Sequence, residues 1–171
     1  MNLKVLVIAA LVSLSSVSQA ATQRTGGPFG LGLILGDPTA LNVKYDSDET
    51  TAFDGGLAFN FDKWVLLYGD YQYKFAGAFA NQRGLSQITP YVGVGLVLVV
   101  SNRSVEDTRK TQYFTDSSSS KVALGIRIPL GIEWRPLNVP IGVFGEIAPG
   151  IAIIPGTIAF FEGGVGVRYY F

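Results

Sequence analysis

The stretch KVALGIRIPLGIEWR, residues 121–135, alternates between two kinds of side chain along its whole length. Its even-numbered positions are all apolar, from Val122 to Trp134, whereas its odd-numbered positions hold small residues and every charge. Successive side chains of a β-strand point to opposite faces of the sheet. The pattern therefore predicts a strand with one apolar face and one mixed face.

Seven other segments alternate in the same way, and residues typical of turns separate them. The eight predicted strands cover residues 29–35, 40–45, 52–61, 64–75, 89–101, 121–135, 141–153 and 158–171. No charged residue lies on the apolar face of any of them. Two connections, 76–87 and 102–120, are longer than the rest, and part of 76–87 is expected to extend the flanking strands. The pattern predicts an all-β chain, an eight-stranded antiparallel up-and-down barrel.

The composition of the chain fits this class of protein. Charged residues make up 15% of the 171 residues, against roughly 25% in soluble domains, and the mean hydropathy is +0.32. Thirteen basic residues balance thirteen acidic ones, so we expect no nucleic-acid partner. The chain has no cysteine and no histidine, which excludes disulfides and thiolate metal sites and removes the commonest general base.

The first twenty residues have the features of a cleavable signal peptide. Lys4 supplies a positive charge, residues 5–14 are apolar, and Ser18, Gln19 and Ala20 form a cleavage site with small residues. The apolar run is about half the length that a membrane-spanning helix needs. We therefore expect residues 1–20 to be removed on export, which leaves one barrel domain in residues 21–171.

The alternation alone does not say which face of the barrel is the inner one. A soluble barrel fills its interior with apolar side chains, whereas an outer-membrane barrel turns them towards lipid. The mixed face is rich in glycine, which suits a crowded lumen and makes a poor water-facing surface. We therefore predict a transmembrane barrel in a bacterial outer membrane, in contact with its lipid. A soluble periplasmic carrier of an apolar ligand, similar to a lipocalin, remains the alternative, and a narrow solute channel is a third reading.

Aromatic residues on the apolar face gather at one predicted interface. With both chain termini on one side, the starts of odd strands and the ends of even strands meet at that side, where a transmembrane barrel carries an aromatic girdle. The aromatic residues predicted there are Phe29, Tyr45, Phe53, Tyr73, Phe75, Trp134, Tyr169 and Phe171. Their placement supports the membrane interpretation.

The mixed face carries equal numbers of opposite charges. The predicted lumen charges are Lys44, Asp54, Asp70, Lys74, Arg127, Glu133, Arg135, Glu146, Glu162 and Arg168. Ions inside a narrow barrel are stable only when they are paired. The balance therefore predicts a charge network that closes the lumen, with Asn42, Asn60, Gln72 and Tyr91 as further members.

Three of these carboxylates, Glu133, Glu146 and Glu162, lie on adjacent late strands and raise the question of acid–base catalysis. The matching positive charges and the narrow lumen favour a structural role. We expect no enzymatic activity, no cofactor and no metal site.

The connection 102–120 is the best candidate for binding another molecule. With periplasmic termini it lies outside the cell, and loops of this length are often functional. Its candidate binding residues are Arg103, Arg109, Lys110, Tyr113 and Phe114. The ligand is not identified by the sequence, and a solvated loop without a fixed partner is the equally weighted alternative.

The C-terminal sequence GGVGVRYYF, residues 163–171, resembles the signal that the assembly machinery of bacterial outer-membrane barrels reads. Val165, Val167, Tyr169 and Phe171 are the residues at the matching positions. LGLILGDPTALNVKY (31–45), YVGVGLVLV (91–99), IRIPLGIEWRP (126–136) and VPIGVFGEIAPG (139–150) are similar to a widespread family of small outer-membrane barrels, comparable to the OmpA transmembrane domain and with spirochaete members. The resemblance implies the barrel assembly machinery as a partner, and it brings no established activity.

Overall fold

The structure is a computed structural model of the chain, and it describes residues 25–60, 64–82, 85–101, 110–114 and 122–171. The predicted signal peptide lies outside the described residues. The strands are β1 (Phe29–Asp37), β2 (Ala40–Asp46), β3 (Thr51–Asn60), β4 (Trp64–Lys74), β5 (Ile88–Ser101), β6 (Val122–Arg127), β7 (Leu130–Trp134), β8 (Ile141–Ile154) and β9 (Ile158–Tyr170). The short helix α2 (Lys110–Tyr113) lies between β5 and β6 in the chain.

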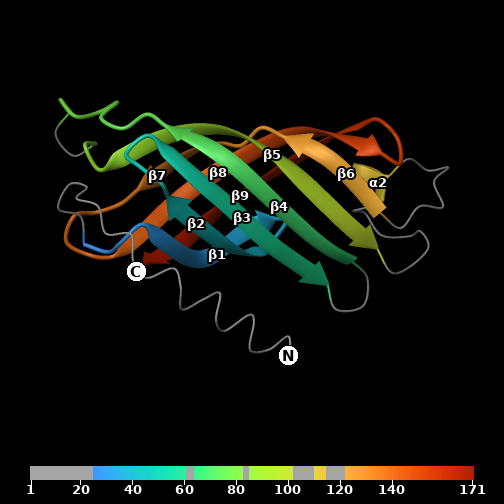
Figure 1. Ribbon diagram of the computed structural model, residues 1–171, viewed down its shortest axis with the longest axis horizontal. Coiled ribbons are helices and arrows are strands. Elements are labelled where there is room, and N and C mark those ends of the chain that lie inside the picture. Colours follow the sequence, from blue (N-terminus) through green and yellow to red (C-terminus); the bar gives the residue numbers. More distant parts are fainter. Residues whose placement is uncertain (1–24, 61–63, 83–84, 102–109, 115–121) are drawn as a thin grey trace.

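The strands form one closed antiparallel sheet (Figure 1). Each strand from β1 to β5 pairs with the next, and β1 also pairs with β9, which closes the ring. β6 and β7 each pair with both β5 and β8, so the two together occupy one place. The ring therefore has eight places, which confirms the predicted all-β, eight-stranded barrel.

The structure has nine strands in these eight places because the predicted strand 121–135 is divided at Ile128 and Pro129. Proline has no amide hydrogen to donate to a strand ladder. The two residues nevertheless stay in the wall, since the N–H of Ile128 donates to the carbonyl of Pro149 at 2.9 Å and the N–H of Gly93 donates to that of Pro129 at 2.8 Å. The strand is interrupted, but its direction and alternation continue.

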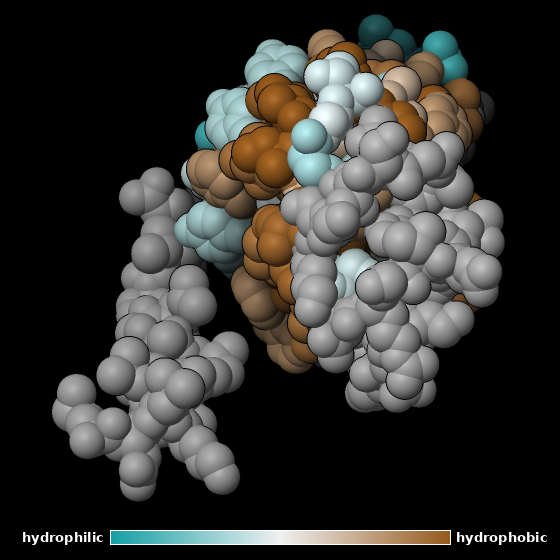
Figure 2. Space-filling model, turned by 90° about the vertical axis from the view of Figure 1, so that its right-hand side faces the viewer, coloured by the Kyte–Doolittle hydropathy of each residue, from teal (hydrophilic) through white to brown (hydrophobic). Residues whose placement is uncertain are grey.

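The apolar face of the barrel is the outer one. From Val122 to Trp134, every even-numbered side chain is between 36% and 55% exposed, whereas Arg127 and Glu133 are at most 5% exposed. Hydrophobic residues form much of the visible outer wall, with more polar residues among them (Figure 2). The inside therefore holds the charges, the reverse of the arrangement in a soluble protein.

The two ends of the barrel differ. We call the end where β1 begins and β9 ends the terminal end, and the opposite end, where α2 lies, the mouth (Figure 1). β4 ends at Lys74 and β5 begins at Ile88, so the expectation that part of 76–87 extends these strands is wrong. The described residues of that connection form turns at the terminal end. Among the described residues, no helix is long and apolar enough to cross a membrane.

Several inward-facing glycines lie beside a bulky side chain of the neighbouring strand. A Cβ atom at such a glycine would overlap that side chain, so only glycine leaves the ring room to lie against the wall. The cross-strand pairs of this kind are Gly30 with Tyr170, Gly56 with Tyr68, Gly131 with Tyr91, Gly150 with Phe160, Gly166 with Phe144, and Gly95 with Asp70. Glycine on the mixed face thus makes space for large side chains that fill the lumen.

Candidate functional site: the charged lumen and its mouth

All ten predicted lumen charges lie inside the barrel, and none is more than 8% exposed. Within each strand they occupy alternate positions, and the positions between them face outward. They form three groups along the lumen, which differ in composition.

The first group, the Arg168 cluster, consists of Lys44, Asp54, Glu133 and Arg168. The guanidinium of Arg168 donates to Oδ2 of Asp54 at 2.6 Å and to Oε1 of Glu133 at 3.2 Å. Lys44 donates to the other oxygen of Glu133 at 2.8 Å. Two cations therefore meet two carboxylates, and the cluster is neutral.

Neutral side chains complete the Arg168 cluster. Asn42 accepts a hydrogen bond from Nε of Arg168 at 2.5 Å and donates to Asp54 at 2.8 Å. The hydroxyl of Tyr170 donates to Glu133 at 2.5 Å. The guanidinium carbon of Arg168 lies 3.5 Å from the ring centroid of Phe144. These contacts occupy the polar atoms of charges that water cannot reach.

The second group, the Arg127 cluster, consists of Arg127, Asp70, Glu146 and Glu162. Arg127 donates to Glu146 at 2.5 Å and to Glu162 at 2.6 Å, and its Nε lies 3.4 Å from Oδ1 of Asp70. Tyr91 donates to the second oxygen of Glu146 at 2.8 Å. One cation thus joins three acidic side chains from three strands.

The third group, the rim cluster, lies at the terminal end and includes a residue that sequence analysis missed. Asp46 accepts from Lys74 and from Arg135, both at 2.8 Å. Lys74 also donates to the carbonyl of Asp48 at 2.7 Å, and Arg135 to that of Gly27 at 3.0 Å. Asp46 has the same parity as Lys44, and this would have identified it if the second predicted strand had not ended at residue 45.

Asp48 shapes the turn between β2 and β3, outside the strands. Its Oδ1 accepts hydrogen bonds from the N–H of Thr50 at 2.7 Å, from the hydroxyl of Thr50 at 2.8 Å and from the N–H of Thr51 at 2.7 Å. These hydrogen bonds lower the pKa of the exposed Asp48 carboxyl, and the bond from the N–H of Thr50 has the largest effect.

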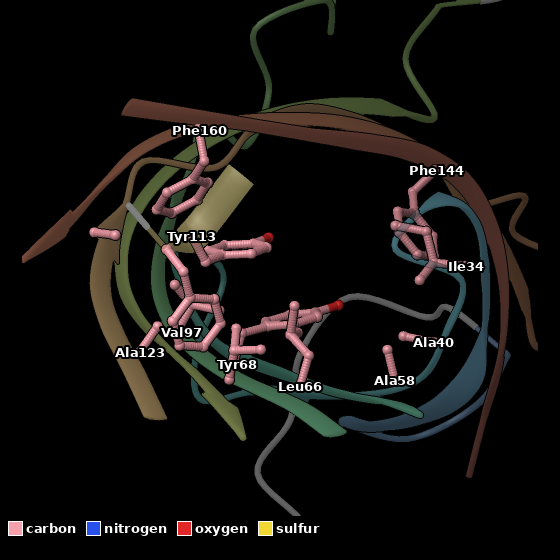
Figure 3. Packing of buried hydrophobic residues seen from close by; sticks show 13 residues of the cluster. Ile34, Ala40, Ala58, Leu66, Tyr68, Val97, Tyr113, Ala123, Phe144 and Phe160 are labelled. Atoms are coloured by element: carbon pink, nitrogen blue, oxygen red, sulfur yellow. The ribbon is translucent and has the colours of Figure 1, made fainter. Parts of the chain in front are cut away.

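The mouth is occupied by α2, which lies inside the ring of strands (Figure 3). The hydroxyl of Tyr113 donates to Glu162, and its ring lies 4.8 Å from that of Phe160. Gln112 donates to the carbonyl of Phe161 at 2.9 Å. Tyr113 and Phe114 are 1% and 3% exposed and pack in an apolar layer beside Phe160. A segment of the long connection therefore fills the mouth.

The predicted binding residues of that connection do not lie together on a described surface. Tyr113 and Phe114 are buried in the mouth, which corrects the expectation that they are exposed to a partner. Arg103 and Arg109 lie outside the described residues, as does the side chain of Lys110. Of the further network members, Asn42 and Tyr91 take part, whereas Gln72 is buried and forms no hydrogen bond with the described residues. The side chain of Asn60 is not described.

The three lumen glutamates are engaged in hydrogen bonds. Glu133, Glu146 and Glu162 each accept a hydrogen bond from a cation and another from a tyrosine. In the part of the chain that the structure describes, no group of three or more acidic residues could hold a metal ion. The Arg168 cluster is thus neutral, whereas the Arg127 cluster sets one cation against three carboxylates.

One family model matches most of the chain, and a known outer-membrane β-barrel domain has a similar fold. A family model described as "Protein of unknown function (DUF3996)" matches residues 20–170. The structure is similar to the N-terminal β-barrel domain of Pseudomonas aeruginosa OprF, with a TM-score of 0.54 and 14% identity over 85% of this chain and 98% of that one. It is also similar to Neisserial surface protein A (NspA), with a TM-score of 0.42 and 11% identity over 84% of this chain and 93% of that one. No curated protein matches the chain.

Proposed function

The chain belongs to the DUF3996 family of proteins of unknown function, and from this premise and its fold we propose that it is an integral outer-membrane β-barrel protein with a structural or surface-interaction role and a lumen closed to solutes. The observation that carries the proposal is the direction of the two strand faces. A continuous apolar outer wall around a charged interior is stable in a lipid bilayer and unfavourable in water.

A soluble carrier of an apolar ligand would need an apolar interior in place of a charged one. A carrier of an apolar ligand holds it in an apolar cavity, whereas the described interior between the terminal end and Tyr113 contains the charges of the Arg168 and Arg127 clusters. The membrane interpretation is therefore favoured over a periplasmic lipocalin-like carrier.

Closure of the lumen is supported by what fills it. The Arg168 cluster links β2, β3, β7 and β9, so its ion pairs reach across the interior from one wall to another. Tyr91, Phe144 and Tyr170 add rings to this level of the barrel, and Tyr113 closes the mouth. A narrow channel would need these side chains to separate, at the cost of unpaired buried charges.

Surface interaction is assigned to the connection between β5 and β6. Its described part, residues 110–114, is fixed to the barrel by Gln112 and Tyr113. The residues proposed to meet a partner are thereby reduced to the remaining charged ones, Arg103, Arg109 and Lys110, since Tyr113 and Phe114 are engaged in the mouth.

Assembly is assigned to the C-terminal strand. Val165, Val167, Tyr169 and Phe171 all point outward and are at least half exposed, as a signal read by another protein requires. The resemblance to spirochaete barrels also belongs to the proposal, and the bacterial outer membrane is the proposed location.

The test is fractionation followed by reconstitution. The proposal predicts that the protein sediments with outer membranes, changes its gel mobility on heating, and gives no steady conductance in planar bilayers. Release with soluble periplasmic proteins would refute the membrane location. Stable conductance of the purified protein would refute the closed lumen alone.

A further inference from the structure

The connection between β4 and β5 is long and poor in charge. Residues 75–82 and 85–88, which we call the apolar foot, contain no charged residue, and Arg83 between them is the one charge of the connection. The neighbouring turn between β2 and β3 contains Asp48 and Glu49, and the one between β7 and β8 begins at Arg135. The foot therefore lacks the acidic residues of the β2–β3 turn.

The foot exposes apolar side chains. Phe75 is 46% and Leu85 is 39% exposed, and Phe79 is half-buried. The alanines between Phe75 and Asn81 are exposed as well. These apolar side chains gain nothing from facing water, although the exposed Asn81, Gln82 and Ser86 lie among them.

The backbone of the foot satisfies many of its own polar groups. The N–H groups of residues 78, 80, 82, 85 and 88 each donate to the carbonyl three residues earlier, at 2.9–3.2 Å. Backbone groups near hydrocarbon must be paired within the chain, because lipid offers no partners. A succession of tight turns meets this requirement far better than an open loop.

The foot is continuous with the apolar outer wall. The ring of Phe75 packs edge-on against that of Tyr73, with centroids 5.3 Å apart, and Tyr73 belongs to the outward face of β4. At the other end of the foot, Ile88 pairs with Trp134, which is exposed on the outer face of β7. Both ends of the foot therefore begin at the aromatic girdle.

We propose that the apolar foot lies in the headgroup region of the lipid leaflet at the terminal end and anchors that end of the barrel to the bilayer surface. Its partner is phospholipid, which apolar side chains enter without a specific head group. The inference rests on the proposed membrane location and extends it from the wall to a connection. A periplasmic protein partner would instead leave the foot in water when the purified barrel is reconstituted.

Tryptophan quenching by brominated phosphatidylcholine tests the proposal in vesicles. The two native tryptophans, Trp64 and Trp134, are replaced by Phe, and Phe79→Trp or Leu85→Trp then reports on the foot. Leu96→Trp on the outer wall is the membrane control. Ser47→Trp, in the acidic turn at the same end, is the water control, and circular dichroism verifies folding of each variant.

The expected result is quenching of about twofold or more at Phe79→Trp, Leu85→Trp and Leu96→Trp, with little at Ser47→Trp. If Leu96→Trp is quenched and neither foot reporter exceeds Ser47→Trp, the foot lies in water and the inference is overturned while the membrane location stands. Equal quenching at Ser47→Trp would also overturn it, since the foot would then not be distinct. An unquenched Leu96→Trp would refute the membrane location itself. Leu85→Trp alone decides if Phe79→Trp does not fold.

Discussion

Replacing Arg168 by methionine tests whether paired charges stabilise the lumen. The substitution keeps a long side chain beside Phe144 and removes the charge that joins Asp54 to Glu133. Glu133 keeps Lys44 and the hydroxyl of Tyr170, whereas Asp54 keeps the hydrogen bond from Asn42. The Arg168 cluster then has two carboxylates and one cation.

The expected loss follows from the carboxylate left without a cation. Removing one partner of a buried pair costs about 3–5 kcal/mol, and Asp54 bears most of this because Glu133 is still paired with Lys44. The double variant Arg168→Met with Asp54→Asn is neutral again, with Lys44 facing Glu133. We expect it to regain about 2 kcal/mol or more relative to the single variant.

The assay is reversible urea unfolding of the barrel refolded in lipid vesicles, followed by tryptophan fluorescence. Val167→Met, at the adjacent outward position, receives the same new side chain without a charge change and should stay within about 0.5 kcal/mol of the wild type. A single variant that loses less than about 1 kcal/mol, or a double variant less stable than the single one, would refute the reasoning.

Three further outcomes are expected. Tyr113→Phe removes the hydroxyl that donates inside the mouth and should lower the free energy of unfolding by about 1–3 kcal/mol, whereas unchanged urea midpoints would mean that the mouth contact is weak. Gly32→Ala places a Cβ against the carbonyl oxygen of Val167 and should destabilise the barrel by about 1–3 kcal/mol. Gly69→Ala, with no atom within 4 Å of its added Cβ, should not destabilise it. Equal thermal stability of the two variants would contradict this expectation. The lowered pKa of Asp48 means that its turn is stabilised at neutral pH and loses this stabilisation as the pH falls through that pKa. A carboxyl NMR titration should give a midpoint below that of an ordinary aspartate. A higher midpoint would contradict the hydrogen bonds.

The faces of the strands could be predicted from the sequence because a strand has a period of two. Parity placed Arg127, Glu133 and Arg168 on the mixed face, and the glycine content of that face indicated that it is the inner one, where these residues are buried. The strand 121–135 was predicted as continuous, although Pro129 could have indicated the interruption, since proline cannot donate to a ladder. Local chemistry of this kind needs no information about distant residues.

The partners of the charges could not be predicted in the same way. Lys44 meets Glu133 across 89 positions of the chain because the stagger and tilt of the strands bring them to one level. The position of Tyr113 in the mouth depends on how the connection between β5 and β6 folds back. That connection has no alternating pattern from which its path could be predicted. The turns of the foot likewise follow no strand period; part of 76–87 was expected to extend the flanking strands only because the connection is long for a periplasmic turn.

Strict alternation does not by itself fix the register between neighbouring strands. The pairs of glycine and bulky side chains do. A strand that slips by one residue turns its apolar face inward, whereas a slip by two leaves every side chain on its proper face. In the observed register Phe144 lies opposite Gly166 and Tyr68 lies opposite Gly56. A two-residue slip would set each ring against a different residue and leave its glycine uncovered. The positions of the glycines thus distinguish the observed register of the closed sheet from registers that are shifted by two residues.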